Sequence, residues 1–200
     1  MPPFAVDPLA VHSFPDAAAL HAWYQRNHAT ASEMWIKIGK KGSGLQSVTV
    51  AEALDEALCW GWIDAIRKGF DEATFLQRYT PRTRTSIWSQ VNIGHIERLR
   101  DAGRMQPTGE AQVKLAQEDG RWARAYGGFT RDQFPPDLLA AIEAEPDALE
   151  FFRTLSAQNR FALGFRTHNM KTAAGRAKKI AAFVEMLKRG ETIYPQGRGK

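Results

Sequence analysis

The residues with the greatest capacity for chemistry lie close together, between positions 59 and 92 (CWGWIDAIRKGFDEATFLQRYTPRTRTSIWSQVN). This segment holds three tryptophans and four arginines. Guanidinium groups bind carboxylates and phosphates through N–H donors in fixed directions, and tryptophan rings stack on flat or cationic groups. The mixture therefore predicts a site for a flat or anionic ligand, without indicating a reaction.

The strongest anion-binding pattern follows the proline at position 81. Arg82 and Arg84 precede Ser89, a suitable N-cap for a helix predicted over residues 89–103. A helix N-terminus presents free backbone N–H groups and a positive dipole end, so two arginines beside it favour an anion. The alternative is that both arginines are solvated surface side chains. The predicted ligand-binding residues are Trp62, Asp64, Arg78, Arg82, Arg84, Ser86, Trp88, Ser89 and Asn92.

A β-hairpin is predicted over residues 62–68 and 74–80. If Lys68 faces Thr74, antiparallel pairing places Asp64 opposite Arg78. Such a pair is either a structural ion pair or a means by which Asp64 orients Arg78 toward a ligand. Asp64 is also the candidate catalytic base of this cluster, but a neighbouring arginine lowers the pKa of a carboxylate and so opposes that role.

Asn92 lies within an apolar arc of the helix predicted after the hairpin, formed by Val91, Ile93, Ile96 and Leu99. A buried asparagine needs hydrogen-bond partners, since leaving them unmade costs about 1–3 kcal/mol. We expect its amide to hold a neighbouring backbone turn; contact with a ligand is the alternative.

The surrounding elements predict an α+β fold, in which a small antiparallel sheet (the hairpin plus one or more extra strands) packs with helices and an all-helical C-terminal lobe follows. A strand is predicted over residues 34–38, and Thr49 and Glu52 form a capping box for a helix that Gly61 ends. Helices are predicted over residues 136–144, 146–155, 156–168 and 172–189. Arg176 falls on the apolar side of the last one, where we expect it to pair with a carboxylate or to extend toward solvent.

The domain organisation expected from these patterns has five parts. They are a flexible leader (1–12), an α+β lobe with the tryptophan and arginine cluster (13–119), a connector (120–134), a helical lobe (135–192) and a disordered tail (193–200).

Composition limits the class of protein. The chain has 200 residues, a formal charge of +5 and one cysteine, Cys59, which cannot form an internal disulfide. Neither a signal peptide nor an apolar run of the roughly 18 residues that span a bilayer is present, so a cytoplasmic protein without a membrane span is expected. The histidine spacing and the loops predict no metal site, nucleophile elbow, phosphate-binding loop or cofactor.

The segment over residues 59–92 and the C-terminal lobe resemble the YdeI/OmpD-associated family, also called bacteriocin-protection proteins. The resemblance rests on EALDEALCWGWIDAIRKGFDEATFLQRYTPR, TSIWSQVNIGHIERLRDAGRM and LSAQNRFALGFRTHNMKTAAGRAKKIAAFVEMLKRGE, which cover most of residues 13–192. It implies a link to resistance to bacteriocins or cationic peptides and, as a protein partner, an outer-membrane porin; it implies no reaction. The matching positions are Gly61, Trp62, Ile63, Asp64, Arg78, Pro81, Arg82, Ser86, Trp88, Ser89, Asn92, Arg160, Arg176, Lys179 and Leu187.

The sequence favours a binding protein that holds a small anionic molecule or an acidic peptide end between tryptophans and arginines. The first alternative is an enzyme that uses Asp64 as a general base. The second is a nucleic-acid or protein-docking module that uses the basic run over residues 171–179, although lysines there fall on the solvent side of an amphipathic helix, which disfavours nucleic acid.

Overall fold

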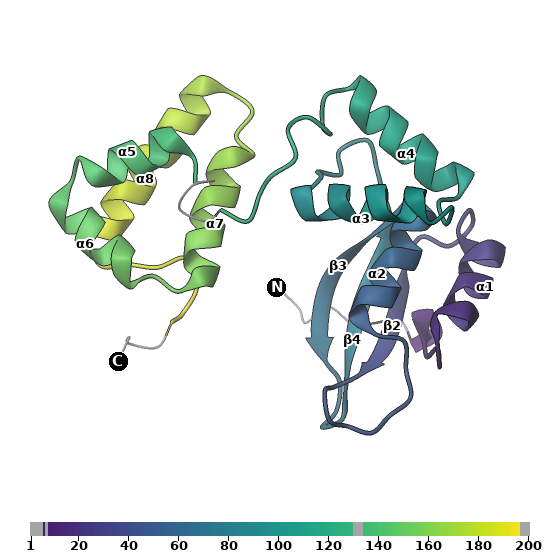
Figure 1. The fold of residues 1–200 in the computed structure, drawn as a ribbon. Coiled ribbons are helices and arrows are strands. Elements are labelled where there is room, and N and C mark those ends of the chain that lie inside the picture. The colour runs from purple at the N-terminus through teal and green to yellow at the C-terminus, as the bar shows by residue number, and fades with distance from the viewer. Residues whose placement is uncertain (1–5, 7, 130–133, 197–200) are drawn as a thin grey trace. The chain divides into compact units, whose positions relative to one another are not determined.

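The computed structural model describes residue 6 and residues 8–129 and 134–196, and the chain divides into two compact units, Met1–Ala125 and Tyr126–Lys200 (Figure 1). Parts of the expected leader (1–5 and 7), connector (130–133) and tail (197–200) lie outside the described residues. The boundary between the units falls within the segment expected to be a connector.

The first unit is built on a four-stranded sheet with the strand order β1-β2-β4-β3. Strands β2 (Met34–Gly39), β4 (Thr74–Pro81) and β3 (Trp62–Gly69) are antiparallel neighbours, with β3 at one edge. The short β1 (Val11–His12) follows a 3-10 helix, η1 (Pro8–Ala10), and pairs parallel with β2. The predicted α+β class, with a hairpin and additional strands, is confirmed.

Local signals fix the helices of the first unit, which are α1 (Ala17–Asn27), α2 (Val50–Cys59), α3 (Gln90–Asp101) and α4 (Pro107–Glu118). The predicted capping box is present, since Thr49 Oγ1 accepts the Glu52 N–H and the Glu52 carboxylate accepts the Thr49 N–H. Gly61, with φ of 78°, takes the left-handed conformation directly after α2. Because α2 ends at this glycine, β3 begins directly after α2 in the chain.

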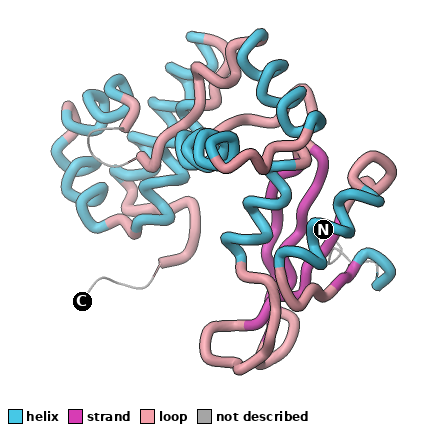
Figure 2. Tube along the Cα trace, turned by 45° about the vertical axis from the view of Figure 1, so that its right-hand side comes forward, coloured by secondary structure: helices cyan, strands magenta, loops and turns pink. Residues whose placement is uncertain are grey.

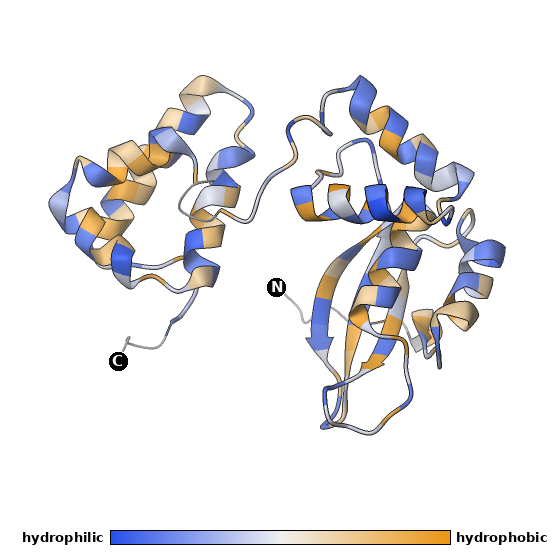
Figure 3. Cartoon of the chain, in the orientation of Figure 1, coloured by the Kyte–Doolittle hydropathy of each residue, from blue (hydrophilic) through white to orange (hydrophobic). Residues whose placement is uncertain are grey.

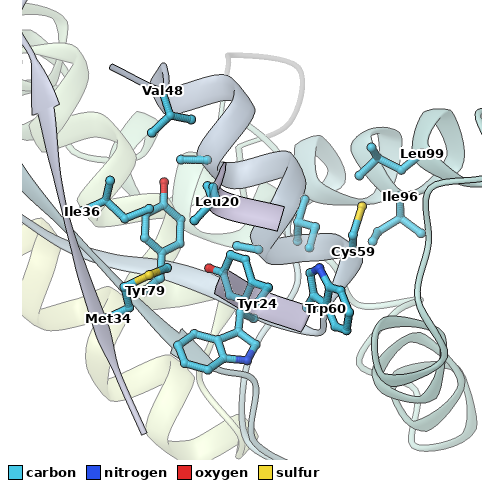
Figure 4. Close-up of a cluster of buried hydrophobic side chains, with 14 of the residues drawn as sticks. Leu20, Tyr24, Met34, Ile36, Val48, Cys59, Trp60, Tyr79, Ile96 and Leu99 are labelled. Carbon is cyan, nitrogen blue, oxygen red and sulfur yellow. The ribbon is translucent and has the colours of Figure 1, made fainter. Parts of the chain in front are cut away.

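The core of the first unit lies where α1 and α2 pack on the sheet (Figure 4). Leu20 and Tyr24 from α1 meet Met34 and Ile36 from β2 and Tyr79 from β4, all of them fully buried. Each such side chain contributes about 1.5–3 kcal/mol through the apolar surface that it removes from water.

The second unit is all-helical in its described residues, as predicted (Figure 2). Its helices are α5 (Pro136–Glu143), α6 (Pro146–Thr154), α7 (Ala157–His168) and α8 (Ala173–Lys188). Hydrophobic residues recur along them (Figure 3) and supply a separate core. Its fully buried members include Leu138, Ile142, Leu163 and Leu187.

Two polar contacts stabilise the second unit. Arg176 of α8 donates from Nε and Nη2 to Asp137 of α5, at 2.6 and 2.7 Å, and from Nη1 to the carbonyl of Thr167 at 2.8 Å. The carboxylate partner expected for Arg176 thus comes from another helix. Although residues 193–200 are expected to be a disordered tail, the Tyr194 N–H donates to Asn159 Oδ1 at 2.9 Å.

In the part of the chain that the structure describes, no helix combines the length and the apolar character needed to cross a bilayer.

Candidate functional site

The turn between β4 and α3, residues 82–89, holds most of the predicted site and is called the arginine turn here (Figure 1). The backbone N–H of Arg82 donates to the carbonyl of Gly61 at 2.9 Å, which fixes the turn beside the beginning of β3. Within the turn, Ser86 Oγ accepts the Thr83 N–H at 2.8 Å. Arg84 is exposed, and no other described residue pairs with its guanidinium.

Arg82 and Trp88 form the interior of this turn. The guanidinium carbon of Arg82 lies 3.6 Å from the centroid of the Trp88 ring, and its Nη1 donates to the carbonyl of Ile87 at 3.1 Å. Only 5% of Arg82 and 2% of Trp88 is exposed. A cation stacked on a shielded indole ring stabilises this local arrangement by about 2 kcal/mol. Arg82 therefore supports the turn from inside.

Arg121 and Trp122 hold the turn from a segment that sequence reasoning assigned to a connector. Arg121 Nη1 donates to the carbonyl of Ser86 at 2.8 Å and to that of Thr83 at 3.3 Å, while its Nε contacts the Asp119 carboxylate. The rings of Trp88 and Trp122 lie 4.9 Å apart. The aromatic and basic run RWAR at residues 121–124 repeats the composition of the predicted site, and this signal could have identified both residues.

Ser89 is the N-cap of α3, as predicted. Its Oγ accepts the backbone N–H of Asn92 at 3.1 Å, so the helix begins at the end of the arginine turn. Asn92 is half-buried. Val91, expected on the buried arc, is 63% exposed, whereas the rest of the arc is buried: Ile93, Ile96 and Leu99.

The side chain of Trp62 lies inside the core of the first unit. Its ring contacts those of Trp23 and Tyr24, with centroids 5.9 and 5.4 Å away, and its Nε1 donates to the carbonyl of His28 at 3.3 Å. With 1% of its surface exposed, Trp62 packs between α1 and the sheet and does not present a ring face to solvent.

The predicted pairing of Asp64 with Arg78 is wrong. Asp64 lies opposite Tyr79, because an irregularity between Asp64 and Arg67 shifts the β3–β4 register. A shift by one residue sends a side chain to the other face of a sheet, so the extra residue separates Asp64 from Arg78. Arg78 instead binds Glu33, with Nε and Nη2 at 2.7 and 2.6 Å from Oε2.

Asp64 has an unusual electrostatic environment for an exposed residue. Partial desolvation raises its pKa, and the positive charges of Arg82 and Arg67 act in the opposite direction. The cations that act on Asp64 are thus Arg82 of the arginine turn and Arg67 of β3, and Arg78 no longer argues against a proton-transfer role.

A second polar cluster, absent from the predicted site, joins α1, α2 and α3. Asp55 Oδ1 contacts His95 Nδ1 at 2.8 Å and accepts from Arg98 at 2.6 Å, and the adjacent Glu56 accepts from Arg104 at 2.6 Å and contacts His21 Nδ1 at 3.0 Å. Both carboxylates are buried. The sequence signal for this cluster was the segment ALDEAL, in which two adjacent acids are flanked by leucine and alanine.

The charges of this cluster are mutually compensated. Burial alone raises the pKa of Asp55, but hydrogen bonds from Arg98 and His95 outweigh it and lower the pKa. A carboxylate held ionised by hydrogen bonds from an arginine and a histidine is suited to bracing helices and is a poor proton acceptor. We therefore interpret the cluster as structural.

Thiol and metal chemistry find no support in the described residues. Cys59 is buried, and burial raises the pKa of its thiol to about 12, so the nucleophilic thiolate is scarcely populated at neutral pH. Among the residues that the structure describes, no three histidine, cysteine or acidic side chains are grouped as metal ligands would be.

Two family models match the chain. One, described as a domain of unknown function (DUF8412), matches residues 12–112. The other, described as bacteriocin-protection, YdeI or OmpD-associated, matches residues 133–190, so this resemblance is found in the C-terminal part and not over residues 13–192. No curated protein and no solved structure shows significant similarity.

Proposed function

The chain belongs to the family described as a domain of unknown function (DUF8412) and carries a bacteriocin-protection, YdeI or OmpD-associated domain, and on this premise we propose that it is a binding protein whose arginine turn holds an anionic group. The group is a small carboxylate or phosphate, or the acidic end of a peptide. The observation that carries this proposal is the exposed Arg84, held on a braced turn beside the N-terminus of α3.

Local charge supports an anion at this position. Arg82, Arg84 and Arg121 belong to the turn or contact it, and Asp119 is the acid bonded to Arg121. The N-terminal N–H groups of α3 add partial positive charge at the same end. Because Arg121 and the stacked Arg82 hold the turn, little ordering entropy opposes binding.

Thermal-shift measurements with inorganic phosphate, citrate and a peptide ending in two glutamates test the proposal. A ligand at about 100 times its dissociation constant stabilises the folded protein by about 2.7 kcal/mol. We expect Arg84→Ala to abolish this stabilisation. The matched control is Arg26→Ala, because Arg26 is another exposed arginine of the first unit, at the end of α1. Equal shifts in the two variants would contradict binding at the arginine turn.

A second candidate function is acid–base chemistry by Asp64. Its raised pKa and its position opposite Tyr79, away from Arg78, favour this role more than the sequence indicated. The two candidates separate in one experiment, since Asp64→Asn removes the base but leaves Arg84 in place. Unchanged binding of the three probes by Asp64→Asn would support the binding function, and loss of a turnover detected with a bound probe would support catalysis.

The family description connects the second unit with bacteriocin protection. We propose that this connection is indirect and follows from ligand binding by the first unit.

A further inference from the structure

Two loops lie side by side at the end of the sheet that is far from α3 and α4 (Figure 1). They are residues 40–47, which follow β2, and residues 70–73, which join β3 to β4. Lys40 connects them, because its backbone N–H donates to the carbonyl of Ala73 at 2.8 Å and its Nζ to that of Asp71 at 2.7 Å. The two loops therefore form one structure, which is called the loop end here.

The loop end exposes two large apolar side chains. Leu45 is 53% exposed and Phe70 is 56% exposed. The Nζ of Lys37 lies 4.6 Å from the centroid of the Phe70 ring, and a Cβ atom at Gly39 would lie 3.4 Å from that of Leu45. Residues 37 and 39 of β2 point to the same face of the sheet, since side chains alternate along a strand. Leu45 and Phe70 thus lie beside the same face.

That face is also the one that carries lysines. Lys37 of β2 and Lys68 of β3 both lie opposite Leu76 of β4, so the three side chains share a face. Ile36, which packs in the core under α1 and α2, points to the other side. The lysines and the two apolar side chains therefore gather on the side of the sheet that these helices leave uncovered.

Charge at the loop end is predominantly positive. Residues 37–47 and 66–74 contain five cations and two acids, namely Lys37, Lys40, Lys41, Arg67 and Lys68 against Asp71 and Glu72. Asp71 forms an ion pair with Lys37 at 3.4 Å. Lys41 is exposed and pairs with none of the residues that the structure describes. An excess of cations around exposed apolar side chains favours an anionic partner.

The apolar members decide which anionic partner fits. Nucleic acid offers phosphates to lysines and base faces to aromatic rings, but it offers nothing to an exposed leucine. The surface of an anionic bilayer offers phosphate headgroups to lysines and, about 5–10 Å deeper, hydrocarbon to leucine and phenylalanine. Long lysine side chains can reach the headgroups while neighbouring apolar groups enter the boundary.

We propose that the loop end docks on an anionic lipid bilayer, with Leu45 and Phe70 inserted at the headgroup boundary and the lysines on the phosphates. This mode of attachment lies on the membrane and requires no spanning helix. Both contributions are needed, since a single apolar anchor gives only marginal, reversible binding. The inference is independent of ligand binding at the arginine turn.

Co-sedimentation of the full chain with lipid vesicles tests the proposal. We expect binding to phosphatidylcholine vesicles that contain about one third phosphatidylglycerol, and at least about tenfold weaker binding to phosphatidylcholine alone. Raising the salt concentration from about 0.1 M to about 1 M should weaken the binding, because the Debye length falls from about 10 to about 3 Å. Equal binding to the two kinds of vesicle would contradict the role of the lysines.

Charge variants locate the contact. Lys41→Glu should weaken binding to anionic vesicles at least about fivefold, which corresponds to about 1 kcal/mol for each cation at such a surface. Lys114→Glu is the matched control, because Lys114 is an exposed lysine of α4, at the other end of the first unit (Figure 1). It should change the binding less than about twofold. Equal effects of the two variants would overturn the proposal.

Apolar variants test the insertion. Phe70→Ser and, separately, Leu45→Ser should each weaken binding to anionic vesicles about tenfold. Val91→Ser is the control, since Val91 is 63% exposed on α3 and lies outside the loop end. Leu45 lies in a loop and is exposed, so its variant keeps the test valid if Phe70→Ser unfolds. Variants at 45 and 70 that bind as the native chain does would exclude insertion.

A fluorescent label tests the geometry directly. Leu45→Cys carrying an environment-sensitive dye should brighten on anionic vesicles, whereas the same dye on Lys114→Cys should not. The native Cys59 is buried with a raised thiol pKa and takes up little dye. Short duplex DNA is the competing partner. Binding of DNA without binding of vesicles, or a dye at position 45 that stays unchanged on vesicles, would each overturn the proposal.

Discussion

Arg82 stacks on Trp88 with its guanidinium carbon 3.6 Å from the ring centroid and donates to the carbonyl of the residue before that tryptophan. The chain therefore folds back on itself over residues 82–88, and one side chain closes the loop. Arg84, two positions further along, points its charge to solvent instead. The two arginines of one sequence pattern thus have different roles, the first in building the turn and the second in presenting a charge.

Replacing Arg82 should destabilise the protein. Arg82→Ala removes the stacking and the bond to Ile87, and we expect the free energy of unfolding to fall by about 1–3 kcal/mol, which lowers the melting temperature by several degrees. Arg84→Ala, at an exposed position, should change it by less than about 0.5 kcal/mol. Thermal and urea unfolding of both variants measure this difference, and an equally small effect of the two would show that Arg82 does not brace the turn.

The stabilising effect of Asp55 should depend on pH. Because its folded-state pKa is lowered, the contribution is complete above about pH 4, the ordinary pKa of an unfolded aspartate, and is lost as the pH falls through the folded-state value. We expect Asp55→Asn to cost about 1–3 kcal/mol at pH 7, since the bonds to Arg98 and His95 lose their charge.

Urea unfolding between pH 2.5 and pH 7 measures the effect of Asp55. The difference between the native chain and Asp55→Asn should be constant near neutral pH and shrink below about pH 4. Asp101→Asn is a suitable control, because Asp101 is exposed at the end of α3. A difference that persists unchanged in acid would show that the lost contribution is packing and not charge.

Asp64 should behave in the opposite way. Its raised pKa means that the folded state favours the protonated carboxyl, so the ionised form destabilises the fold as the pH rises through the folded-state pKa. Asp64→Asn should therefore stabilise the protein at pH 7, by less than about 1 kcal/mol because the residue is exposed, and should have no effect in strong acid. Unfolding of this variant at pH 3 and pH 7 gives the sign, and destabilisation at pH 7 would contradict it.

Features that depend on neighbouring residues were predictable from the sequence. The capping box of Thr49 and Glu52, the N-cap Ser89 and the left-handed Gly61 each need only a few consecutive positions, and all three are present. The helices of the second unit followed from their apolar periodicity in the same way.

Features that depend on distant residues were not predictable. Asp55 meets Arg98 across 43 positions, and Arg121 reaches Ser86 across 35, so no local pattern joins them. The pairing of Asp64 failed for a related reason, since period-two alternation holds only until a strand gains a residue. Trp62 shows that residue type alone does not separate a core aromatic from a ligand-facing one.

Two helical glycines of the first unit should respond to alanine in opposite directions. A Cβ atom at Gly109 of α4 would lie 2.2 Å from the carbonyl oxygen of Cys59, at the end of α2, so Gly109→Ala must move one helix away from the other. Overpacking of this kind costs about 1–3 kcal/mol. At Gly94 of α3 an added Cβ meets nothing within 4 Å, and alanine should stabilise the helix by about 0.5–1 kcal/mol. Urea unfolding of the two variants measures both signs. If Gly109→Ala also raised stability, this result would contradict the close contact between α4 and the end of α2.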